Sequence, residues 1–126
     1  MQIKDCFNNI ECAYVDATNF DGTTTMEFSA PKECLNQYFP NGDYSVESFN
    51  GGEDFTEPIY VNSMSIKLVV PNNSTDFKQV QAWVSPCVTH EYEEFDDWDW
   101  KQVNLDEETI HGLVKIATIQ HMGFYM

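Results

Sequence analysis

The sequence predicts an α+β fold, in which an antiparallel sheet of about five or six strands packs against a C-terminal helix, with one short additional helix. Three observations support this class. An Asp-Gly pair at 21–22 separates two segments rich in β-branched and aromatic residues, residues 59–70 alternate as a strand does, and apolar residues recur at helical spacing after Asp106. The 126 residues match one ordinary domain, so we expect residues 1–126 to fold as a unit.

The Asp-Gly pair predicts a β-hairpin with arms at 12–18 and 24–29, because both residues accept the positive φ angles of a two-residue turn. In the second arm Met26 and Phe28 alternate with polar residues. One face of the sheet should therefore be apolar.

Proline and glycine residues divide the middle of the chain. Pro31 and Pro40 bracket a short helix at 32–39. Turn residues bracket a predicted strand at 44–49, and glycines beside acids mark 50–55 as a loop.

Residues 59–70 form the longest predicted strand, which Pro71 ends. Residues 77–84 fit both the strand and the helix periodicity, and we favour a strand because the turn residues at 72–75 suit a meander. We expect every second residue of this strand to lie on the same face, namely Tyr60, Asn62, Met64, Ile66, Leu68 and Val70.

The strongest helix signal begins after Asn104 or Asp106, either of which can cap a helix. Glu107 and Glu108 lie in the first turn, where the helix dipole favours negative charge, and Gly123 is a stop signal. The predicted apolar face consists of Ile110, Leu113, Val114, Ala117 and His121, and Ile116 and Ile119 widen it. A helix with such a face should pack on the sheet.

The charge balance limits the function. The chain holds 21 acidic residues and six basic ones, all lysine, for a net charge of −15. Without arginine, and with so few cations, a direct nucleic-acid binder is excluded, and a phosphotransferase is disfavoured. The first residues lack the apolar stretch of a signal peptide and no apolar run is long enough to span a membrane, so we expect a cytoplasmic protein of a bacterial host with no membrane contact and reduced cysteines.

Catalytic and metal sites are weakly indicated. Cys87 and His90 have the spacing of half a zinc site, without the other half. Asp96, Asp97 and Asp99 could bind a divalent cation, but the glycine and the later glutamate of a calcium loop are absent. We therefore expect no cofactor, no metal and no enzymatic activity.

The acidic residues concentrate near the C-terminus. Residues 91–126 carry nine of the 21 acids against two lysines, and Tyr92, Phe95, Trp98 and Trp100 lie among the acids of 91–100. Such a run is either a solvated loop or an ordered surface whose acids face solvent together or in two groups. Alternate residues of a strand lie about 6.8 Å apart, and DNA advances about 3.4 Å per nucleotide along each strand, so ordered carboxylates can approximate a row of phosphates.

The acidic excess, the absence of arginine and the aromatic-acidic segment 91–100 resemble the phage-encoded DNA mimics of the anti-CRISPR and anti-restriction class. The resemblance implies a non-catalytic inhibitor that binds the basic nucleic-acid-binding surface of a nuclease or CRISPR effector. Two alternatives remain: an immunity protein that neutralises a nuclease toxin, and a small metal-binding module or enzyme. The predicted partner-binding residues are Glu91, Glu93, Glu94, Asp96, Asp97, Trp98, Asp99, Asp106, Glu107, Glu108, Glu53 and Asp54.

Overall fold

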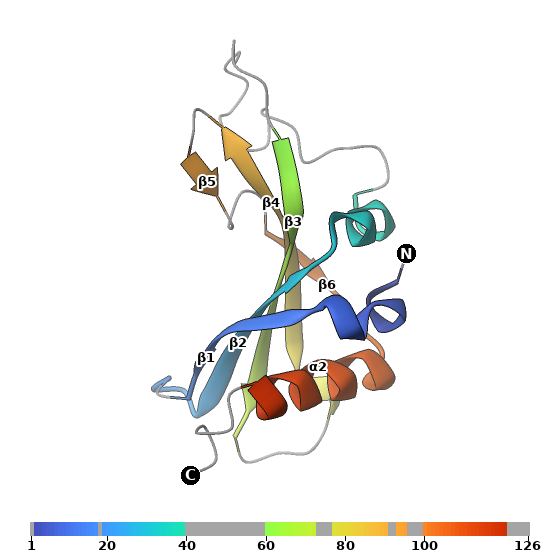
Figure 1. Ribbon diagram of the computed structural model, residues 1–126. Coiled ribbons are helices and arrows are strands. Elements are labelled where there is room, and N and C mark those ends of the chain that lie inside the picture. The colour runs from blue at the N-terminus through green and yellow to red at the C-terminus, as the bar shows by residue number, and fades with distance from the viewer. Residues whose placement is uncertain are drawn as a thin grey trace.

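The computed structural model describes residues 2–17, 19–39, 60–72, 77–90, 93–95 and 100–120. These residues form a six-stranded antiparallel sheet, a C-terminal helix and a few short 3-10 helices (Figure 1). The predicted α+β class is confirmed. The predicted strand at 44–49 and the predicted loop at 50–55 lie outside the described residues.

The predicted hairpin is present. Strand β1 (Glu11–Asp16) pairs with β2 (Thr23–Ala30), and Gly22 in the turn has φ 77°. The Asp21 carboxylate accepts hydrogen bonds from the backbone N–H of Thr23 at 3.2 Å and from its hydroxyl at 2.6 Å. The last paired residues are Asp16 and Thr25, so the connection is longer than the predicted two-residue turn, and Asp21 and Gly22 form only its second half.

The remaining strands continue the meander. Strand β3 (Tyr60–Pro71) pairs with β2, and β4 (Gln81–His90) pairs with β3. The 3-10 helix η4 (Phe77–Gln79) precedes β4, so the strand favoured for 77–84 is confirmed from Gln81 onward.

Two short strands share the other edge of β4. Strand β5 (Glu93–Phe95) pairs with residues 88–90, and β6 (Lys101–Val103) pairs with residues 82–84. Pro86 lies in the interval between these two pairings, where its missing N–H removes no bond from either short ladder. A proline inside a long strand is tolerated there for that reason.

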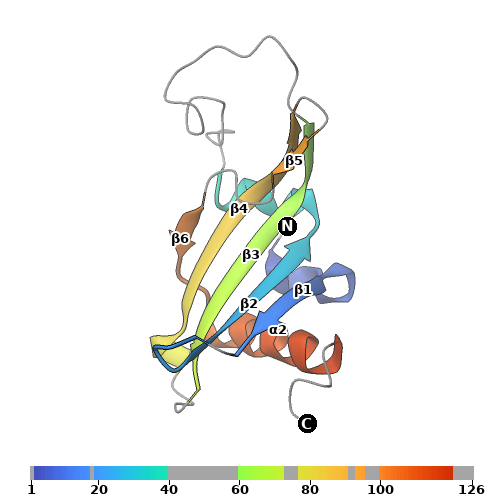
Figure 2. The same cartoon turned by 90° about the vertical axis from the view of Figure 1, so that its left-hand side faces the viewer.

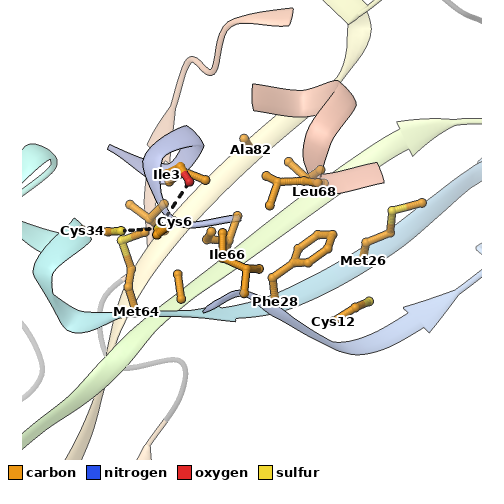
Figure 3. Close-up of a cluster of buried hydrophobic side chains, with 14 of the residues drawn as sticks. Ile3, Cys6, Cys12, Met26, Phe28, Cys34, Met64, Ile66, Leu68 and Ala82 are labelled. Atoms are coloured by element: carbon orange, nitrogen blue, oxygen red, sulfur yellow. Dashed lines mark hydrogen bonds between the residues drawn. The ribbon is translucent and has the colours of Figure 1, made fainter. Parts of the chain in front are cut away.

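One face of the sheet, the core face, is covered by helix α2 (Glu107–Gln120) and by the 3-10 helices η1 (Ile3–Asp5), η2 (Phe7–Asn9) and η3 (Lys32–Gln37). Its side chains form one buried cluster with the helices (Figure 3). The sheet contributes Met26, Phe28, Met64, Ile66, Leu68, Ala82 and Val84. The opposite face, which we call the open face, is turned to the viewer in Figure 2.

The predicted core face of 59–70 is correct from Met64 onward and wrong at its start. A bulge between Val61 and Ser63 places Val61 opposite Val88 and breaks the alternation. Val61 therefore packs against the core, while Tyr60 is 62% exposed and Asn62 is exposed. A one-residue insertion in a strand moves every side chain before it to the other face.

The predicted C-terminal helix is present, and Asp106 rather than Asn104 caps it. The backbone N–H of Thr109 donates to Asp106 Oδ1 at 2.7 Å. Ile110, Leu113 and Ala117 are buried as predicted, but Ile119 is 60% exposed because it lies beyond the sheet-facing stripe. His121 and Gly123 lie outside the described residues.

Candidate acidic interface

The carboxylates of β5 are the described part of the aromatic-acidic segment. Glu93 and Glu94 are exposed, and their backbones pair with His90 and Thr89 of β4. A paired backbone holds these two side chains in defined directions, which a disordered acidic loop would not do. The predicted partner residues Glu91, Asp96, Asp97, Trp98, Asp99, Glu53 and Asp54 lie outside the described residues.

Glu94 is positioned by the bulge of β3. Asn62, the residue that the bulge turns away from the core, donates through Nδ2 to Thr89 Oγ1 at 2.7 Å and to Glu94 Oε2 at 3.5 Å. The second contact is at the limit of a hydrogen bond and orients the carboxylate weakly. Sequence reasoning missed Asn62, although an amide in an otherwise apolar alternation was a signal that the alternation breaks.

A hollow of about 450 Å³ opens beside Glu94 on the open face. Three serine hydroxyls, Ser29, Ser63 and Ser65, line it, and Glu27 and Glu94 are its two carboxylates. The rest of its lining is Ala13, Tyr14, Phe28 and Cys87. The hollow therefore has a mixed polar and apolar lining and carries acceptors for a positively charged group.

Tyr14 at the edge of this hollow is held as a neutral phenol. Its hydroxyl donates to Asp16 Oδ2 at 3.0 Å, and this bond raises the pKa of Tyr14, with a smaller contribution from the charge of Glu27. The side chain therefore adds no negative charge of its own at neutral pH.

A second acidic group lies at the start of α2, where Asp106, Glu107 and Glu108 are exposed. Figure 1 shows this end of α2 and strand β5 at different ends of the molecule. Of the nine C-terminal acids, the five that the structure describes therefore lie in two separate groups, one on β5 and one at the start of α2.

The second group is also part of the fold. Hydrogen bonds from Thr109 lower the pKa of Asp106, and Lys4 lies 3.7 Å from Asp106 Oδ2 and 3.9 Å from Glu108 Oε2. The three side chains are largely exposed, so these ion pairs are screened by solvent. Asp106 caps the helix, and Asp106 and Glu108 both approach Lys4 of the N-terminal segment, which accounts for them without any partner.

Two lysines are directed to aromatic rings. The Lys67 ammonium on the open face lies 4.9 Å from the Trp83 ring centre and 4.7 Å from that of Trp100. The Lys101 ammonium donates to the Tyr38 carbonyl at 2.6 Å and lies 5.2 Å from the Phe39 ring centre. These two cations are engaged by ring faces and a carbonyl oxygen.

The rings of the aromatic-acidic segment pack partly inward where they are described. Phe95 and Trp100 are half-buried, and Trp100 covers Lys67. Tyr92 and Trp98 lie outside the described residues. The Trp83–Lys67–Trp100 contact joins three strand regions far apart in sequence, and the sequence carries no signal for it.

The described ranges contain no group of three or more His, Cys, Asp or Glu side chains arranged to hold a metal ion. Among the same residues, no helix has the length and apolar character needed to cross a membrane. Comparison with protein-family models, curated proteins and solved structures finds no match. Function has to be inferred from the chain's own residues.

Proposed function

We propose that this protein is an acidic, non-catalytic inhibitor that binds the basic nucleic-acid-binding surface of a bacterial defence enzyme, such as a nuclease or CRISPR effector. The observation that carries the proposal is the uncompensated negative charge of the surface. The net charge is −15, and Lys67 and Lys101 direct their ammonium groups to rings and a carbonyl. The carboxylates of Glu93 and Glu94 remain exposed on a paired strand.

The hollow beside Glu94 supports a specific mode of contact. A basic groove that binds nucleic acid presents lysine and arginine side chains. One such side chain can enter the hollow, where the Glu27 and Glu94 carboxylates and the serine hydroxyls offer acceptors for its N–H groups. In this arrangement the Glu27 and Glu94 carboxylates take the place of phosphate groups, and long-range attraction accelerates association at low salt.

The experiment is a DNA-binding competition. Purified nucleases and CRISPR effectors are incubated with labelled target DNA, the protein is titrated in, and DNA release is followed by fluorescence anisotropy at rising salt. We expect release at low salt that weakens as salt rises. A wild-type protein that leaves DNA binding unchanged in every enzyme contradicts the proposal.

A charge-matched pair of variants locates the surface. Glu93→Lys with Glu94→Lys changes the charge of β5, and Glu11→Lys with Glu33→Lys makes the same change at exposed positions on β1 and η3. We expect the β5 variant to inhibit at least about tenfold less well, which is about 1.4 kcal/mol, and the control to stay near wild type. Equal losses in both variants would show that only the net charge matters.

A further inference from the structure

Two buried thiols from distant parts of the chain touch in the core. Cys6 lies between η1 and η2, Cys34 lies in η3, and their Sγ atoms are 3.2 Å apart (Figure 3). Cys6 is 3% exposed and Cys34 is fully buried. The two residues are 28 positions apart in sequence, so their meeting is a property of the tertiary structure.

The surroundings keep the Cys34 thiol protonated while the core is closed, and they hydrogen-bond the Cys6 thiol. Cys6 Sγ donates to the Ile3 carbonyl at 3.3 Å. Burial, together with the hydrogen bond and the charge of the adjacent Cys6 thiol, raises the pKa of Cys34 to about 12. Because the thiolate is the reactive form, the closed pair reacts slowly with oxidants.

The N-terminal segment provides the route to reaction. It consists of two 3-10 helices of three residues each before β1. Such short helices open at lower cost than a central strand, and opening exposes Cys6 to solvent. When the segment closes again, Cys6 returns to contact with Cys34.

We propose that Cys6 and Cys34 are a disulfide-forming site, whose substrate is a small-molecule disulfide such as oxidised glutathione. The Cys6 thiolate attacks one sulfur of the reagent and releases one glutathione thiolate. The Cys34 thiolate then attacks the Cys6 sulfur of the mixed disulfide and releases the second. Two electrons pass from the protein to the reagent, and the two protons of the protein thiols end on two glutathione molecules.

The product would tie the N-terminal segment to η3. That segment carries Lys4, which contacts Asp106 and Glu108, and Phe7, which lies against Gly112 of α2. Closing a loop of 28 residues restricts the unfolded chain. By loop-closure entropy the thermal midpoint should rise by about 10 °C. Oxidation would therefore fix the segment beneath the second acidic group.

The experiment compares reduced protein with protein equilibrated in oxidised glutathione. We expect the free thiol count in denaturant to fall from four to two. A peptide map without reductant should join the peptides of Cys6 and Cys34, and the melting midpoint should rise by about 10 °C. Linkage through Cys12 or Cys87, a stable mixed disulfide, four remaining thiols, or an unchanged midpoint overturns the proposal.

Single substitutions provide matched controls. Cys12→Ser and Cys87→Ser each remove a different buried thiol and should retain both the linkage and the oxidation-dependent rise. Cys6→Ala and Cys34→Ala should each abolish the rise. Because the linkage is mapped on the wild-type chain, the proposal stays testable even if an alanine variant folds poorly.

Discussion

Gly112 in the middle of α2 allows the Phe7 ring to lie against the helix backbone. A Cβ added at this position would lie 2.3 Å, 2.6 Å and 2.8 Å from three atoms of the ring, where ordinary contact begins at 3.4 Å. The ring would have to retreat by about 1 Å or more, and overpacking of this kind costs about 1–3 kcal/mol. Alanine in a helix returns up to about 1 kcal/mol relative to glycine.

We therefore expect Gly112→Ala to lower the free energy of unfolding by about 1–2 kcal/mol, or the melting midpoint by about 3–6 °C. In a Phe7→Ala background the clash is absent, and the same substitution should stabilise by up to about 1 kcal/mol. Urea denaturation of the four proteins of this double-mutant cycle measures the difference, which we expect to be about 2–3 kcal/mol. Gly112→Ala that stabilises the wild-type chain, or acts equally in both backgrounds, would refute the reasoning.

Three further predictions concern single side chains. The Gln120 side-chain amide accepts from the Cys12 backbone N–H of β1 at 2.6 Å and donates to the Ile10 carbonyl at 3.3 Å. Gln120→Leu should therefore lower the free energy of unfolding by about 1–2 kcal/mol, measured by urea denaturation. Gln120→Glu keeps only the acceptor and should lower the free energy of unfolding less at acidic pH than at neutral pH. Burial raises the pKa of Tyr38 to about 12, so this phenol ionises in the unfolded chain first, near pH 10, and the stability of the folded chain should fall between pH 10 and 12. Tyr38→Phe should lose less stability than the wild-type chain over that range, measured by thermal melts. Lys67→Met should remove about 1 kcal/mol of contact with its two indole rings and change the tryptophan emission spectrum, and an unchanged spectrum would contradict the contact.

The elements that the sequence predicts well are those with local causes. The Asp21-Gly22 turn needs only a short side chain and a residue that tolerates positive φ, and the start of α2 needs only an acceptor at Asp106 before its first turn. The alternation of apolar residues identified Met64, Ile66 and Leu68 as core residues, because the position of a residue along a strand determines which face its side chain lies on.

The errors have long-range causes. Asn62 leaves the predicted core face because a bulge forms against β4, and Ile119 is exposed because it lies outside the sheet-facing stripe of the helix. Strands β5 and β6 were not predicted, since three residues carry too little periodicity and their pairing depends on the free edge of β4. The run of acidic residues likewise gives no local signal that its members in β5 and at the start of α2 lie apart.

The sequence by itself determined the α+β class, the hairpin, the cap of the last helix and a surface of strong negative charge, because turn chemistry, periodicity and charge are properties of neighbouring residues. The tertiary structure alone decided that Lys67 lies between two indole rings, that Asn62 meets Glu94, and that the thiols of Cys6 and Cys34 touch. Each of these contacts joins residues at least 16 positions apart along the chain. They form only when packing of the core brings separate strands and helices together, and no local pattern encodes them.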